Sequence, residues 1–66
     1  MLENNLYNLM VQMVEENRSL WRILNQYKQD AADSDCNECL AFWDKMILDK
    51  EDHIKELKDL IKSHMK

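Results

Sequence analysis

Four polar side chains that could form an ion pair or bind a metal interrupt the apolar pattern of this sequence, two of them near the middle of each half. Glu16 and Asn17 interrupt the first half, and Lys50 and His53 interrupt the second. If folding brings these groups together in a core, they must satisfy one another, because buried polar groups without partners are costly. A carboxylate and an ammonium in such a layer act as a lock that sets the register of packed helices. We therefore predict a polar layer made of these four residues.

The same region could instead hold a metal ion. Carboxylates and histidines that project into a helical bundle are the ligands of di-iron and related sites. Glu16 from the first half, with Asp49, Glu51 and His53 from the second, would supply such ligands. Lys50 opposes this hypothesis, because an ammonium repels a cation and competes for Glu16. The structural lock is the preferred interpretation, with no cofactor, and iron or another divalent transition metal is the alternative.

Cys36 and Cys39 form a second chemically interesting group, a C-x-x-C pair at the start of a predicted helix. A helix start can lower a thiol pKa, and two such pairs from two chains could bind zinc. A thioredoxin-like site needs a strand–helix–strand context, and the sequence predicts no strands. We expect both cysteines to be reduced and to fill core-facing positions as small apolar side chains.

Apolar residues recur at helical spacing in both halves, which predicts one helix from about residue 2 to 30 and another from about 35 to 64. We call the row of positions that faces the other helix the seam. In the first helix the expected seam is Leu6, Met10, Met13, Asn17, Leu20, Leu24 and Tyr27. In the second it is Cys36, Leu40, Trp43, Ile47, Lys50, Ile54, Leu57, Ile61 and His64. Further apolar residues flank both seams, and so wide a stripe suits a helix packed against two neighbours.

The segment from Asp30 to Asp35 is the only candidate turn in a chain with 0 Gly and 0 Pro. We place the turn at about residues 31–34, and Asp35 with Glu38 resembles a capping box that opens the second helix. The lack of glycine disfavours a turn with a left-handed residue. Two similar helices with one short connection predict an all-α antiparallel hairpin, a single domain over residues 1–66. Because one hairpin cannot cover such wide stripes, we expect a dimer that forms a four-helix bundle.

Charge and composition narrow the classes of partner. The formal net charge of −4 argues against a general nucleic-acid binder and against binding to an anionic membrane. The longest apolar run, Cys39–Trp43, is far shorter than a membrane span, and the first residues lack signal-peptide features. We therefore expect a cytoplasmic protein with no membrane partner. The outer face of the first helix is rich in Asn, Gln and Arg, which could contact RNA or a protein.

Two family resemblances bear on function. The stretch from Met46 to Leu57, MILDKEDHIKEL, resembles the second helix of ferritin-like and rubrerythrin-like proteins, where an acidic run ends in His. Val14-Glu15-Glu16-Asn17, followed by Tyr27, resembles their first helix. This resemblance implies an encapsulated-ferritin arrangement, in which hairpins dimerise around a metal, although Lys50 stands where that family has Glu. Size and topology also resemble the Rop family, acidic hairpins whose dimers bind RNA loops.

The sequence has no Gly-rich phosphate loop, and a chain this short cannot enclose a deep pocket in one subunit. We therefore predict a small interaction or regulatory protein that forms a homodimer, accepts a protein partner and has no catalytic activity of its own. A ferritin-like metal-binding hairpin and a Rop-like RNA-binding dimer stay open as alternatives. Only a metal in the bundle would make the protein an enzyme.

Overall fold

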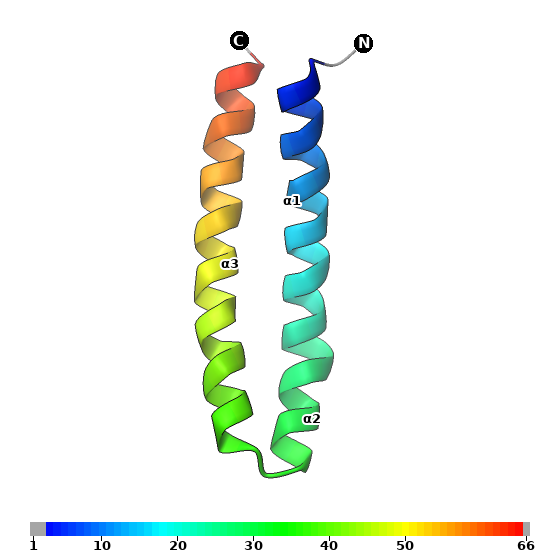
Figure 1. Cartoon of the computed structure of the whole chain (residues 1–66), viewed down its shortest axis with the longest axis vertical. Coiled ribbons are helices and arrows are strands. Elements are labelled where there is room, and N and C mark those ends of the chain that lie inside the picture. Colours follow the sequence, from blue (N-terminus) through cyan, green and yellow to red (C-terminus); the bar gives the residue numbers. More distant parts are fainter. Residues whose placement is uncertain (1–2, 66) are drawn as a thin grey trace.

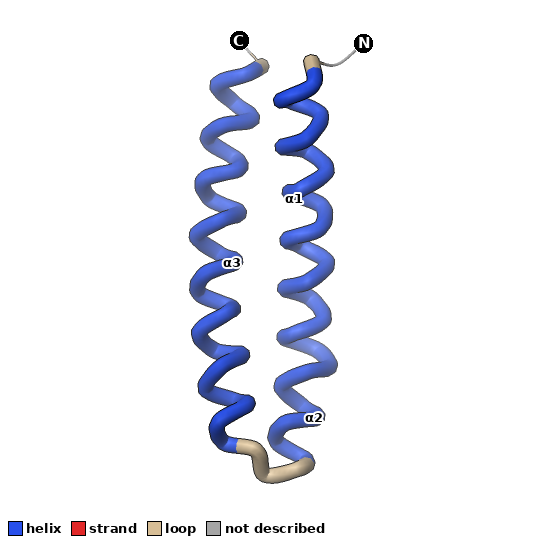
Figure 2. Tube along the Cα trace, in the orientation of Figure 1, coloured by secondary structure: helices blue, strands red, loops and turns tan. Residues whose placement is uncertain are grey.

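The computed structural model describes residues 3–65 as two long helical arms that lie side by side (Figure 1). The first arm contains α1 (Asn4–Arg22), a π-helical segment η1 (Ile23–Tyr27) and α2 (Lys28–Asp33), and the second arm is α3 (Asn37–His64). The described residues are helical apart from the chain end and the turn, which confirms the all-α prediction (Figure 2). The arms run antiparallel, as in the predicted hairpin. Leu2, the predicted start of the first helix, lies outside the described residues.

The first helix is capped by an acidic side chain. Glu3 is its N-cap residue, and its carboxylate accepts hydrogen bonds from the backbone N–H groups of Asn5 at 2.8 Å and Leu6 at 3.0 Å. These donors have no partner within the helix, so the cap satisfies them. Nδ1 of His64, at the end of α3, lies 3.3 Å from the Glu3 carboxylate. This contact ties the two arms together at the end opposite the turn.

The turn differs from the predicted one in three respects. The first arm stays helical to Asp33, and the N-cap of α3 is Cys36, not Asp35. Asp35 has a φ of 54°, so the turn does use a left-handed residue despite the lack of glycine. Aspartate tolerates this conformation better than most residues. The left-handed residue reverses the chain, and the backbone N–H of Cys36 then donates to the Ala31 carbonyl at 2.9 Å.

The seam of the first arm is turned slightly about the helix axis relative to the predicted one, so that three positions are replaced by the residue just before each: Leu9, Glu16 and Ile23. Its inward positions are Leu6, Leu9, Met13, Glu16, Leu20, Ile23 and Tyr27. Ile23 is only 1% exposed, whereas Leu24, which we predicted to face inward, is 52% exposed. The expected frame was therefore wrong at Asn17 and Leu24, which are exposed, whereas Met10 is half-buried. Four other predicted members of the seam do face inward: Leu6, Met13, Leu20 and Tyr27. The observed frame places the Glu16 carboxylate against α3, where a cation can pair with it.

The π-helical segment keeps this seam pointed at α3 near the turn. Within it, the backbone N–H of Lys28 donates to the Ile23 carbonyl, five residues back. The wider turn shifts the helix register, as a π-bulge does, so that Tyr27 and Ala31 also face α3. The Tyr27 ring packs on the Trp43 ring with 5.1 Å between centroids.

The seam predicted for α3 is largely confirmed. Its members from Leu40 to Ile61 are buried or half-buried, and Leu57 is the most buried of them. The hairpin core is nevertheless thin, because only four apolar residues in the described part of the chain are buried: Leu6, Ile23, Ala31 and Leu57. No helix in residues 3–65 is both long enough and apolar enough to cross a bilayer.

Candidate functional site

Glu16 is the centre of the polar layer and is only 8% exposed. Its Oε2 accepts a hydrogen bond from Nζ of Lys50 at 3.0 Å. Its Oε1 lies 3.2 Å from Nδ1 of His53 and accepts from Nε2 of Gln12 at 3.3 Å. We call these four residues the Glu16 cluster. The structure therefore brings together Glu16, Lys50 and His53 from the two arms, as the sequence predicted.

The cluster keeps Glu16 ionised. Burial by itself would raise the pKa of the Glu16 carboxyl. The hydrogen bond and positive charge of Lys50, with smaller contributions from His53 and Gln12, outweigh burial and lower the pKa below its usual value. A carboxylate held ionised beside an ammonium is suited to binding and register-setting, and it has no proton to donate at neutral pH.

Asn17 does not belong to the cluster, contrary to the prediction. It is exposed, and its side-chain amide donates to the Met13 carbonyl of its own helix at 2.8 Å. Gln12 takes part instead, and sequence reasoning missed it. The available signal was its spacing, because residues four apart on a helix are neighbours on one face. Gln12 lies four residues before Glu16 and can therefore reach the same carboxylate.

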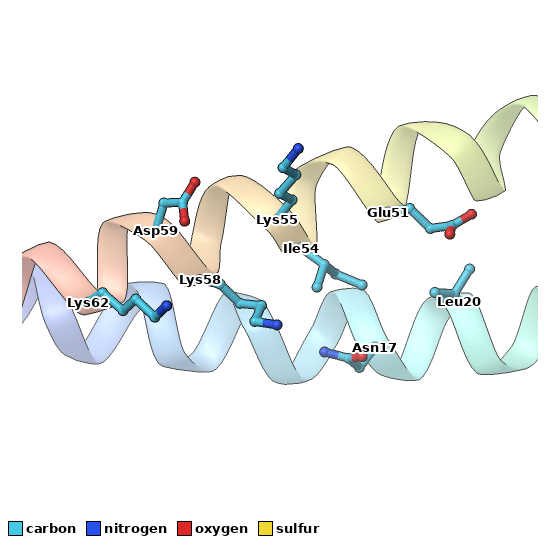
Figure 3. Close-up of a pocket in the computed structure, with 8 residues that line it drawn as sticks. All are labelled: Asn17, Leu20, Glu51, Ile54, Lys55, Lys58, Asp59 and Lys62. Carbon is cyan, nitrogen blue, oxygen red and sulfur yellow. The ribbon is translucent and has the colours of Figure 1, made fainter.

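The proposed metal ligands are not gathered around one point. Glu16 and His53 lie together, but the exposed Asp49 does not join them. Glu51 lines a different groove, with Asn17 and Leu20 (Figure 3). Within residues 3–65, no three His, Cys, Asp or Glu side chains are close enough together to hold a metal ion. The inward position beside Glu16 is occupied by the Lys50 ammonium.

Cys36 and Cys39 are joined by a disulfide, so the expectation of two reduced thiols was wrong. The bond spans the first turn of α3, where the two Cα atoms are 5.2 Å apart. Cys36 is half-buried and Cys39 is exposed, so neither fills the core as a small apolar side chain. The predicted capping by Asp35 does not occur, and this leaves Cys36 in the N-cap position within reach of Cys39.

The two sides of the seam differ in chemistry. We define the Trp21 face as the side of the hairpin that holds the Figure 3 groove, which Asn17 and Leu20 of the first arm line together with Glu51, Lys55, Lys58, Asp59 and Lys62 of α3. Helical spacing from Asn17 places Tyr7, Val14, Trp21 and Leu24 on this side, and spacing from Glu51 places Asp44 there. The opposite side, the His53 face, includes Gln12, His53 and Leu60. An apolar row thus lies beside a charged row on the Trp21 face.

The charged row of the Trp21 face is ordered along α3. In the Figure 3 groove, Glu51 lies nearest the turn, and Lys55, Lys58, Asp59 and Lys62 follow toward the other end. Asp44 precedes Glu51 by seven residues and is nearer the turn still. Near the turn, Nζ of Lys28 lies 2.8 Å from the Asp44 carboxylate and closes the seam there. The end of the face near the turn therefore carries acidic groups, and the other end carries three lysines with one aspartate among them.

Comparisons with protein families, curated proteins and solved structures find no match for this chain.

Proposed function

We propose that this hairpin is a protein interaction module that works as a homodimer, with the Trp21 face as its interface. The observation that carries the proposal is the apolar row along the first arm. Tyr7, Val14, Trp21 and Leu24 are 56%, 49%, 56% and 52% exposed, and their spacing places them on one side of the helix. Several exposed apolar side chains on one side of a helix are typical of an interface.

The thin core supports the same conclusion. A chain of 66 residues with four buried apolar residues in its described part has little hydrophobic stabilisation of its own. Small helical scaffolds commonly gain the rest from a partner subunit. Burial of Trp21 and Tyr7 against a second chain would remove two of the largest exposed apolar side chains from water.

The charge order on α3 favours a second copy of the chain as the occupant. A twofold axis across the Trp21 face would pack α1 on the partner's α1 and α3 on the partner's α3, both antiparallel. The apolar row would then meet itself, with Tyr7 near Leu24 of the partner subunit. Asp44 and Lys58 are each seven residues from Glu51. With the axis near Glu51, each Asp44 would face the partner's Lys58.

The competing arrangement is less favourable. If α1 packed on the partner's α3, the twofold axis would run along the helices, Trp21 would lie near Asp44 and Val14 near Glu51. Apolar side chains would then cover carboxylates that have no partner across the interface. In the preferred arrangement the two Glu51 carboxylates approach the axis, and Lys55 follows one turn later to offset their repulsion. The product is an antiparallel four-helix bundle whose Glu16 clusters set the register of each hairpin.

Sedimentation velocity of the parent and of a Trp21→Glu variant tests the proposal. The parent should sediment as a dimer at micromolar concentration, and Trp21→Glu should be a monomer that keeps its helical circular dichroism. Leu60→Glu, a matched change on the His53 face, should stay dimeric. A parent that is monomeric at all concentrations, or a Trp21→Glu variant that dimerises as tightly as the parent, would refute it.

A further inference from the structure

We propose that the Cys36–Cys39 disulfide is a thiol–disulfide exchange site, where an incoming peptide thiolate attacks Cys39 and Cys36 leaves. The position of the bond is the first argument. It joins residues three apart within one helical turn and does not connect α3 to the first arm. The helix already holds these two residues near each other, so the bond adds little to the hairpin as a staple. Its placement suits a bond that opens and closes while the fold persists.

The two sulfurs have different environments, and this sets the direction of attack. Cys36 is the N-cap of α3, and its Sγ accepts the backbone N–H of Cys39 at 3.2 Å. A hydrogen-bond donor and the positive end of a long helix stabilise a thiolate, which makes Cys36 the better leaving group. Cys39 is exposed and Cys36 is half-buried, so Cys39 is the more accessible target.

A recess beside Cys39 indicates the class of substrate. It has a volume of about 250 Å³, and its walls include Tyr27, Ala31, Trp43 and Cys39 itself. The paired aromatic rings, 5.1 Å apart, form a largely apolar wall. Asp30 also lines the recess, and its negative charge disfavours an acidic side chain next to the attacking cysteine. We infer that the substrate is a cysteine peptide in which an apolar residue adjoins the cysteine.

The exchange balances without any further cofactor. The peptide thiolate forms a bond to Sγ of Cys39, the Cys36–Cys39 bond breaks, and Cys36 takes the electron pair as a thiolate. A second thiol of a peptide dithiol then attacks the mixed disulfide and releases Cys39 as a thiolate. Two electrons pass from the dithiol to the protein, and the peptide leaves as a disulfide.

The first test identifies the attacked sulfur. Oxidised protein is mixed with excess N-acetyl-Phe-Cys-amide, quenched with acid during the reaction, and cleaved after Glu38 so that the two cysteines fall on separate fragments. Mass spectrometry should find the peptide adduct on the Cys39 fragment. An adduct mainly on Cys36, or no exchange at all, would overturn the proposal.

The second test examines the recess and the fold. N-acetyl-Phe-Cys-amide should react several times faster than N-acetyl-Ser-Cys-amide, and Ser34→Leu, which covers the recess, should abolish this preference. The reduced protein and a Cys36→Ser, Cys39→Ser variant should keep the helical circular dichroism of the parent. Equal rates for both peptides in the parent would overturn the substrate assignment, and loss of helix on reduction would show that the bond is structural.

Discussion

The Glu16 carboxylate and the Lys50 ammonium lie 3.0 Å apart across the middle of the hairpin, although 34 residues separate them in the sequence. Three further contacts between charged or titratable groups join the arms: His53 with Glu16 beside this pair, Lys28 with Asp44 near the turn, and Glu3 with His64 at the open end. Only the central pair has both side chains largely shielded from water. This pair is therefore the contact that fixes which side of the first arm faces α3.

Removal of one member of this pair should cost more than removal of both. Lys50→Leu leaves the buried Glu16 carboxylate without its strongest partner, and we expect a loss of about 3 kcal/mol in the free energy of unfolding. Glu16→Leu combined with Lys50→Leu replaces the pair with apolar side chains and should be at least as stable as the parent. Urea unfolding followed by circular dichroism gives both values. A double variant that is less stable than Lys50→Leu would contradict the proposal that the Glu16–Lys50 pair sets the register of the two arms.

The stability of the hairpin should fall in acid because of Glu16. Its pKa in the folded chain is lowered from an ordinary value of 4.5, so folding favours the ionised form. The stabilising contribution is therefore fully present above about pH 4.5 and is lost as the pH falls through the folded-state pKa. Urea midpoints measured between neutral and acidic pH should show this loss, and Glu16→Gln should flatten the curve.

Two controls separate Glu16 from the other carboxylates. Glu3 has the same sign of effect, because its pKa is lowered chiefly by the backbone N–H of Asn5, so a smaller acid dependence should remain in Glu16→Gln. Glu15→Gln changes an exposed neighbour and should leave the parent curve unchanged. An identical acid dependence in the parent and in Glu16→Gln would rule out the proposed role of the cluster.

The sequence predicted α3 more closely than the first arm, and the reason is physical. The outer face of α3 is densely charged, so only one side of this helix could face inward. Lys50 was correctly placed on that side. The first arm has apolar residues on two adjacent sides of the helix, for example Ile23 and Leu24. The positions of the apolar residues alone therefore cannot show which side faces α3. The choice depends on Glu16 meeting Lys50, a contact between residues far apart in the sequence.

The turn and the disulfide were harder to predict for a related reason. A capping box at Asp35 was compatible with the local sequence, and the N-cap at Cys36 lies only one residue later. That shift depends on the left-handed conformation of Asp35, for which glycine would have been the usual signal. Once Cys36 caps α3, Cys39 lies one turn along the helix, and the two sulfurs are close enough to bond.

The rotated seam predicts a sharp contrast between two neighbouring residues. Ile23→Ala removes a side chain that is 1% exposed and should cost about 2–4 kcal/mol of unfolding free energy. Leu24→Ala removes a half-exposed side chain and should cost much less within a single hairpin. Urea unfolding at a concentration where the protein is monomeric measures both changes. Equal losses would mean that Leu24, as the first frame supposed, also faces α3.

The antiparallel dimer makes a charge-exchange prediction that distinguishes it from packing of α1 on the partner's α3. Lys58→Asp should place a carboxylate opposite each Asp44 of the partner subunit and weaken dimerisation about tenfold, roughly 1.4 kcal/mol. Adding Asp44→Lys should restore dimerisation, because each new lysine faces the new aspartate of the partner subunit. Lys28→Gln is included in every variant, since Lys28 pairs with Asp44 within one chain.

Sedimentation equilibrium gives the dimer dissociation constants for this series at low salt, where charge effects are largest. A matched control, Lys45→Asp on the outer face of α3, should leave the dissociation constant unchanged because that residue lies away from the Trp21 face. If Asp44→Lys weakens the dimer further, instead of rescuing Lys58→Asp, Asp44 and Lys58 do not meet across a twofold axis. The row of Tyr7, Val14, Trp21 and Leu24 would then need a different occupant.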